Sequence, residues 1–121
     1  TDVCVPISNL VECINFTEEE IKKLGLKAPM VGHVGDGNFH AIIGYDPNKK
    51  GEYEKIRTLS NKLIDKTLEL EGTITGEHGI GLHKKAYLLK EHADNIPAMK
   101  LIKRSLDNNN IMNPGKIFDL N

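Results

Sequence analysis

The chain has 121 residues, of which 39% are hydrophobic and 27% are charged. Its 16 Lys and Arg residues nearly balance its 17 Asp and Glu residues, and a near-neutral chain without a basic stripe argues against a dedicated nucleic-acid-binding protein. No apolar run approaches the ~18 residues of a membrane-spanning helix, and two cysteines are too few for a disulfide framework. A chain of this length can bury one hydrophobic core. It starts at Thr1, in what reads as a strand, so we expect a piece of a longer protein.

The first part of the chain predicts a short strand followed by a helical region. Residues 2–6 alternate around two valines, which is typical of a strand. Apolar residues with helical spacing follow over residues 10–24, and Gly25 is a typical helix end. A capping signature at Thr17 allows two short helices with a break near Asn15.

The middle of the chain predicts a hairpin, a long helix and a further strand. Residues 30–35 and 38–45 flank an Asp-Gly pair, and we expect them to form a β-hairpin with a two-residue turn. Residues 52–71 carry an apolar stripe with helical spacing. The β-branched residues 73–75 predict a fourth strand.

This order of elements, β-α-β-β-α-β, predicts an α+β, ferredoxin-like fold: a four-stranded antiparallel sheet with two covering helices. Residues 81–91 and 96–108 look helical, whereas residues 113–116, Asn-Pro-Gly-Lys, cannot lie inside a helix. We therefore assign residues 1–75 to the ferredoxin-like part. Residues 76–121 form a loop and a C-terminal helical extension.

Two histidines flank the expected hairpin turn. With a two-residue turn His33 lies opposite His40, and their Cβ atoms are then about 4.5–5.5 Å apart, so both imidazoles can reach one metal ion. Val34 and Phe39 would fill the opposite face of the hairpin. For an arbitrary pair of this kind the simpler explanation is that the two rings stack or form hydrogen bonds on a half-exposed face.

A second cluster, Gly-Glu-His-Gly-Ile-Gly at residues 76–81, follows the expected fourth strand. Its spacing matches neither common phosphate-binding glycine pattern. If Glu77 joins the two hairpin histidines, the set suits Zn²⁺, with Fe²⁺ or Mn²⁺ as alternatives, and His78 is left to move protons. The alternative is that Glu77 caps the following helix and His78 lines its start. We expect His83 and His92 to face solvent without a role.

Residues 32–40, residues 75–81 with Lys84, and residues 113–116 together resemble a known family. It is the C-terminal part of the FAD-linked D-2-hydroxyacid dehydrogenases of the vanillyl-alcohol-oxidase type. The resemblance is strongest to the D-lactate (cytochrome) and glycolate-oxidising branches, and residues 2–8 resemble a strand of the D-lactate branch. The three motifs follow in the same order over essentially the whole chain, which makes the resemblance specific.

The resemblance implies roles for five residues. His33, His40 and Glu77 would hold the divalent metal. His78 would be the base that takes the substrate hydroxyl proton while a hydride passes to FAD. Glu77, His78 and Asn113 would lie beside the flavin.

For the whole protein, the resemblance implies an FAD-binding domain elsewhere in the same chain, and we expect this piece alone to be inactive. D-Lactate is the favoured D-2-hydroxy acid. The resemblance suggests that relatives acting on 2-hydroxyglutarate have a polar Asn at the position of Ile42, and an apolar residue there suits lactate better than a substrate with a second carboxylate. The D-lactate branch further implies cytochrome c or a quinone as electron acceptor, and a mitochondrial location. The alternative is a freestanding ferredoxin-like metal-binding or regulatory module without redox activity.

Overall fold

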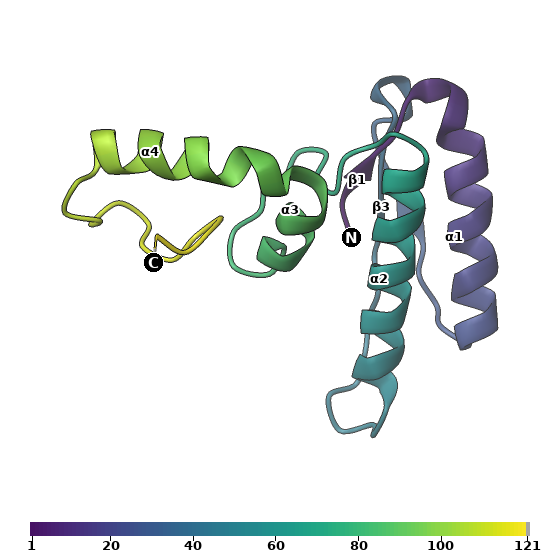
Figure 1. Ribbon diagram of the computed structural model, residues 1–121. Coiled ribbons are helices and arrows are strands. Elements are labelled where there is room, and N and C mark those ends of the chain that lie inside the picture. The colour runs from purple at the N-terminus through teal and green to yellow at the C-terminus, as the bar shows by residue number, and fades with distance from the viewer. Residues whose placement is uncertain (121) are drawn as a thin grey trace. The chain divides into compact units, whose positions relative to one another are not determined.

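The computed structural model describes residues 1–120 and is an α+β structure. The chain forms two compact units, the first covering Thr1–His78 and the second beginning at Gly79 (Figure 1). None of the helices in the described part of the chain is both long and apolar enough to cross a membrane.

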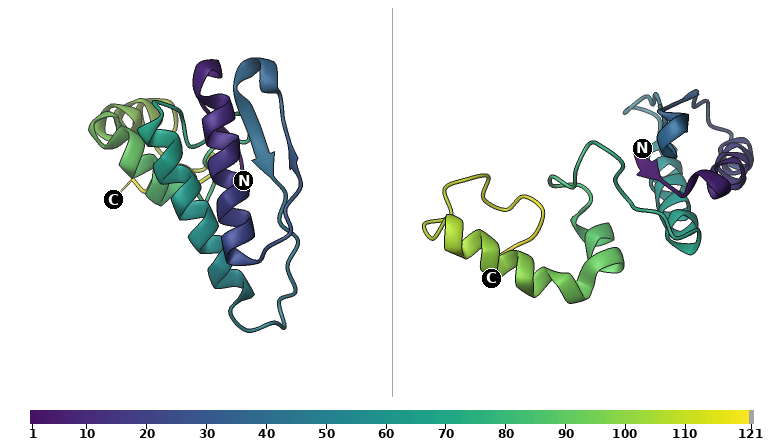
Figure 2. Two further views of the ribbon diagram at one scale, coloured as in Figure 1. Left: turned by 90° about the vertical axis from the view of Figure 1, so that its right-hand side faces the viewer. Right: turned by 90° about the horizontal axis from the view of Figure 1, so that it is seen from above.

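The first unit consists of a small antiparallel sheet and two long helices. The sheet has the strand order β1-β3-β2, and α1 and α2 run side by side against it (Figure 2). One cluster of buried residues, Ile21, Ala41 and Leu59, joins α1, β3 and α2. The elements, in chain order, are β1 (Val3–Cys4), α1 (Leu10–Leu24), β2 (Met30–Val31), β3 (Asn38–Ala41) and α2 (Glu52–Glu69).

The first helix confirms the expected end and corrects the expected break. α1 ends at Gly25, which has a left-handed conformation with φ of 65°. It is continuous through Asn15, so the prediction of two short helices is wrong. The reason lies in Thr17, which does not cap a helix: its side chain is buried, and its Oγ1 donates a hydrogen bond to Cys13 O at 2.7 Å.

The two hairpin segments pair as expected, but in a different register. Val31 lies opposite His40, so the predicted pairing of His33 with His40 is wrong. The turn is longer than two residues, because Val34–Asp36 form a 3-10 turn that ends at Gly37 with φ of 77°. The shift is an even number of residues, which keeps each side chain on its expected face of the sheet.

A consequence of the longer turn is that Val34 does not pack with Phe39. Val34 is 58% exposed, whereas Phe39 is 2% exposed. The expected apolar pair is therefore also wrong, and Phe39 packs in the core without it.

The fourth strand is reduced to an isolated antiparallel bridge between Cys4 and Thr73. The sheet therefore has three strands rather than the four expected, and the full ferredoxin-like topology stays a prediction. Further along the chain, the backbone N–H groups of Glu77 and His78 bond to the carboxylate of Asp2 and not to a strand.

Alternation along β1 and β3 places apolar core side chains on one face of the sheet and polar side chains on the other. Val3 lies opposite Phe39, and both are buried. Side chains alternate between the two faces of a strand, so Asp2 and His40 lie on the other face. That face is the one that the helices leave uncovered.

In the second unit both helices are shorter than expected. α3 (Lys85–His92) starts four residues later than predicted, because Gly79 and Gly81 have φ of 75° and 53°, outside the helical region. α4 (Ile96–Leu106) ends at Asp107, whose carboxylate accepts the backbone N–H groups of the chain that turns back at residues 111 and 112.

The Asn-Pro-Gly-Lys segment at residues 113–116 lies outside the helices, as predicted, and forms a turn. The N–H of Lys116 donates to Asn113 O at 3.2 Å. Lys85 Nζ holds this tail through Gly115 O at 3.2 Å and Asp119 Oδ1 at 2.6 Å.

Glu20 connects the two helices of the first unit. It is 4% exposed, and it accepts hydrogen bonds from Lys62 Nζ at 2.6 Å and Lys23 Nζ at 2.9 Å. These two hydrogen bonds hold the pKa of Glu20 below its ordinary value of 4.5, and the bond from Lys62 has the larger effect. A lowered folded-state pKa means that Glu20 stabilises the fold above that ordinary value and loses this effect as the pH falls through the folded pKa.

We therefore expect Glu20→Gln to lower the unfolding midpoint at pH 7, and the difference from the wild type to shrink at a pH below 4.5. Thermal unfolding followed by circular dichroism at both pH values measures this. Glu18→Gln is the control, because Glu18 is exposed and its ion pair with Lys22 is 3.8 Å long. An equal loss at both pH values would contradict the role of the Glu20 charge.

Candidate metal and proton-transfer site

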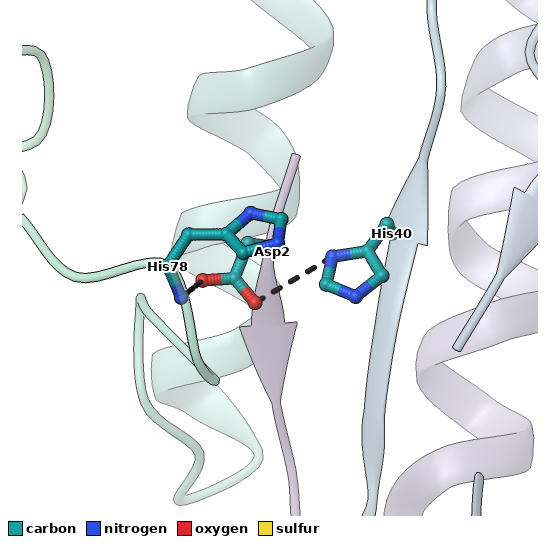
Figure 3. A group of neighbouring side chains, drawn as sticks. All are labelled: Asp2, His40 and His78. Carbon is teal, nitrogen blue, oxygen red and sulfur yellow. Dashed lines mark hydrogen bonds and ion pairs between the residues drawn. The ribbon is translucent and has the colours of Figure 1, made fainter. Parts of the chain in front are cut away.

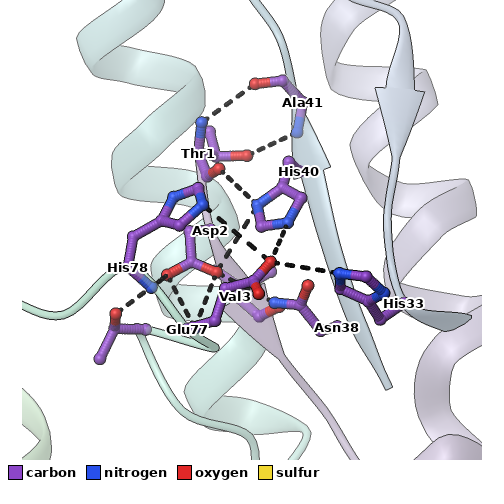
Figure 4. A network of polar contacts seen from close by, with 10 residues as sticks. Thr1, Asp2, Val3, His33, Asn38, His40, Ala41, Glu77 and His78 are labelled. Carbon is purple, nitrogen blue, oxygen red and sulfur yellow. Dashed lines mark hydrogen bonds and ion pairs between the residues drawn. The ribbon is translucent and has the colours of Figure 1, made fainter. Parts of the chain in front are cut away.

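The site is built on the uncovered face of the sheet, at the start of β1. The Val3–Phe39 register places Asp2 directly beside His40. Thr1 continues the same ladder, because its amino group donates to Ala41 O at 3.0 Å and its Oγ1 accepts the Ala41 N–H at 2.7 Å (Figure 4).

Three imidazole nitrogens lie around one carboxylate oxygen, Glu77 Oε1. His40 Nε2 is 2.9 Å away, His33 Nε2 is 3.7 Å away and His78 Nε2 is 4.0 Å away. The structure thus brings together all four residues that the sequence predicts for this site (Figure 4). The His40 side chain is 12% exposed, whereas those of His33, Glu77 and His78 are 67%, 45% and 63% exposed, which leaves one side of the cluster open to a ligand.

The histidines meet differently from the expected hairpin pair. His40 stacks on His78, with ring centroids 4.7 Å apart and an angle of 10° between the rings. His33 reaches the cluster through the side chain of Glu77 and not through a direct cross-strand position. The alternative in which Glu77 caps the next helix is wrong, because α3 begins only at Lys85.

Asp2 is a member of the site that sequence reasoning missed. It is 2% exposed, and one ligand atom from each of Asp2, His40 and His78 lies within 4.8 Å of the others (Figure 3). The available signal was its position: it alternates with two core valines, Val3 and Val5, so a carboxylate had to lie on the face opposite the core.

Gly76, the first glycine of the second cluster, allows the backbone to pack closely against Asn38 and Asp2. A Cβ on Gly76 would lie 1.9 Å from Asn38 Nδ2 and 2.9 Å from Asp2 Oδ1, so only glycine fits here. Asn38 Nδ2 donates to Asp2 Oδ1 and to Val3 O, each at 3.0 Å. The other amide atom, Asn38 Oδ1, is buried and has no hydrogen-bond partner among the residues that the structure describes.

The donor set fits a divalent transition metal. Imidazole nitrogens and a carboxylate are the ligands of Zn²⁺, and of Fe²⁺ and Mn²⁺, in sites that keep positions open for substrate. Cys4 lies on the same face but is not part of this set. Burial, with smaller contributions from the carboxylates of Asp36 and Asp2, raises the pKa of the Cys4 thiol, so it stays protonated near neutral pH.

Three other predicted residues lie in the second unit. His83 is exposed, as expected. His92 is half-buried, and its Nε2 is 3.2 Å from Glu91 Oε1. Asn113 is exposed and has a left-handed backbone with φ of 48°; its predicted place beside the flavin stays a prediction.

Comparison with known proteins identifies the family. The model of the FAD linked oxidases, C-terminal domain, matches residues 1–117. The chain is 46% identical over 121 residues to the protein of Danio rerio named "Probable D-lactate dehydrogenase, mitochondrial", which covers 99% of this chain and 24% of the relative. It is 42% identical over 119 residues to "D-lactate dehydrogenase [cytochrome], mitochondrial" of Arabidopsis thaliana, covering 98% of this chain and 21% of the relative.

The name of a bacterial relative corresponds to the other branch that the motifs resemble. "Glycolate oxidase subunit GlcD" of Bacillus subtilis is 38% identical over 118 residues, covering 97% of this chain and 25% of the relative. The chain thus spans a quarter or less of the length of these relatives. Because the family model matches nearly the whole chain, the protein belongs to the FAD linked oxidases, of which this chain is the C-terminal domain.

Proposed function

We propose that this chain is the substrate-side part of an FAD-dependent dehydrogenase that oxidises a D-2-hydroxy acid, D-lactate first, to the 2-oxo acid. The observation that carries the proposal is the cluster of three imidazole nitrogens around Glu77 Oε1 on the uncovered face of the sheet. The names of the relatives agree with this reaction, since they include D-lactate dehydrogenases and a glycolate oxidase subunit.

In the proposed arrangement His33, His40 and Glu77 hold a divalent metal, with Zn²⁺ favoured over Mn²⁺ and Fe²⁺. When bound, such a metal lowers the pKa of a coordinated substrate hydroxyl and fixes its orientation. His40 is the anchor of this set, because its side chain is the most buried of the three histidines and is nearest to Glu77.

His78 is the proposed base. Its side chain is 63% exposed, so it can meet a substrate, while its ring is held against His40 by stacking. A neutral imidazole of His78 would take the proton of the 2-hydroxyl, and bound FAD would accept the C2 hydrogen as a hydride. The substrate would thus give one proton to His78 and one hydride, which carries both electrons, to the flavin. Glu77, His78 and Asn113 are proposed to lie beside that flavin.

The proposed division of labour follows the two parts of the chain. Residues 1–75 are proposed to be the ferredoxin-like part of the substrate domain, in which Thr73 forms a bridge to β1. Residues 76–121 form the active-site loop and a helical segment that returns to the FAD-binding domain of the same full-length protein. Exposed apolar side chains in the second unit support such docking, because a surface of this kind marks a contact site; they include Leu101, Ile102, Leu106, Ile111 and Met112.

The substrate and its surroundings are inferred from one residue and from the relatives. Ile42 follows His40 by two residues and is 54% exposed, and an apolar side chain there suits lactate better than a second carboxylate. A mitochondrial location is proposed because the names of the plant and fish relatives include it. Cytochrome c or a quinone is the proposed electron acceptor, and the name of the plant relative includes a cytochrome.

The test is anaerobic stopped-flow mixing of the full-length flavoprotein with D-lactate, L-lactate and glycolate, with metal content measured on the same sample. We expect rapid bleaching of the flavin by D-lactate and stoichiometric divalent metal. Metal binding without flavin reduction by any of the three acids would instead favour the alternative, a metal-binding or regulatory module.

A further inference from the structure

We propose that the buried carboxylate of Asp2 is the positioning residue of this site: it holds the loop that carries Glu77 and His78 and sets the orientation of His40. This inference rests on the proposed function. Nothing in the relatives' names or in the family description assigns a role to Asp2.

The first argument is the number of groups that this one carboxylate binds. Oδ1 accepts Asn38 Nδ2 at 3.0 Å, and Oδ2 accepts Thr75 Oγ1 at 2.9 Å and the His78 N–H at 3.0 Å. The Glu77 N–H lies 3.3 Å from both oxygens. Hydrogen bonds to a charged acceptor are the strong ones, so Asp2 fixes the backbone from which Glu77 and His78 project.

The second argument concerns the ring of His40. Its Nδ1 faces two acceptors, Thr1 O at 3.1 Å and Asp2 Oδ1 at 3.6 Å. Its Nε2 faces the carboxylate of Glu77 at 2.9 Å. With a metal bound at Nε2, the ring proton would lie on Nδ1, where Thr1 O and Asp2 Oδ1 would face it. A carboxylate or carbonyl behind a ligating histidine fixes the tautomer and the orientation of its ring.

The third argument separates positioning from direct ligation. Asp2 could be counted as a ligand, because its oxygen lies near nitrogens of His40 and His78. However, both of its oxygens already accept hydrogen bonds from two or more donors. The Glu77 side chain is 45% exposed, whereas Asp2 is 2% exposed. Glu77 is therefore the proposed metal ligand, and Asp2 holds the ligands in place without binding the metal.

The experiment compares Asp2→Asn with Asp36→Asn in the full-length flavoprotein. The change of charge and shape is the same in both, and Asp36 is exposed in the hairpin turn. Three properties are measured: the rate at which a chelator removes the metal, the visible spectrum of the Co²⁺-substituted protein, and the rate of flavin reduction by D-lactate. FAD content and the unfolding midpoint report on folding.

We expect the chelator to remove metal from Asp2→Asn faster than from the wild type, and D-lactate to reduce the flavin of this variant more slowly. Each rate should change about 10–100-fold, the range for residues that hold metal ligands in place. The Co²⁺ bands should stay in place, because the ligands are unchanged, and Asp36→Asn should behave as the wild type. Rates for Asp2→Asn equal to those of Asp36→Asn would overturn the inference. A Co²⁺ spectrum with altered coordination would also overturn it, in favour of Asp2 as a ligand.

A milder variant covers the case in which Asp2→Asn does not fold. Thr75→Val removes the hydrogen bond from Thr75 Oγ1 to Asp2 Oδ2 and should speed metal release several-fold. No change in metal release for Thr75→Val would then count against the inference. If the wild type holds metal and reduces flavin but the variants show no effect, only the inference about Asp2 fails. If the wild type does neither, the proposed function fails together with this inference.

Discussion

His40→Ala in the full-length flavoprotein should lose its divalent metal and nearly all of its activity while it keeps FAD. His40 has the most buried imidazole of the cluster and the shortest contact to Glu77, at 2.9 Å. It is proposed to touch metal and substrate and not the flavin phosphates. Loss of a direct ligand should exceed the 10–100-fold cost of an outer partner, so we expect activity to fall by more than about 100-fold.

Metal content by mass spectrometry, FAD absorbance and steady-state turnover measure this together. His33→Ala should follow the same pattern. His83→Ala is the matched control, because His83 is exposed in the second unit and has no proposed role. If His40→Ala kept stoichiometric metal and normal turnover, the hairpin histidines would have a structural role only.

His78→Asn should slow flavin reduction while the metal stays bound. A positioned general base contributes about 10²–10⁴-fold, and we expect a loss in that range in the rate of flavin reduction by D-lactate. Proton removal matters in the transition state more than in substrate binding, so the apparent affinity should change less than the rate. Anaerobic stopped-flow mixing over a range of D-lactate concentrations separates the two quantities.

His83→Asn is the control with the same chemical change. A rate for His78→Asn within about threefold of the wild type would be too small for a general base, and His78 would then be a stacking partner of His40. Loss of metal in His78→Asn would instead make His78 a ligand.

The sequence by itself located the two long helices of the first unit and singled out four residues that the structure brings together. Helical hydrogen bonds join residues four apart, so apolar spacing and a terminal glycine are enough to locate a helix. This is why the end of α1 at Gly25 and the start of α2 at Glu52 agree with the prediction. The motifs likewise singled out His33, His40 and Glu77 before any geometry was known.

The tertiary structure decided the register of the strands and the role of Asp2. Strand pairing joins residues far apart in the chain, and its register depends on the turn. The 3-10 turn at Val34–Asp36 moved Val31, and not His33, opposite His40. In the same way, Asp2 meets Glu77, 75 residues away, only because β1 pairs with β3 and the chain returns beside β1 at Thr73. Such contacts depend on long-range packing, which local sequence patterns do not specify.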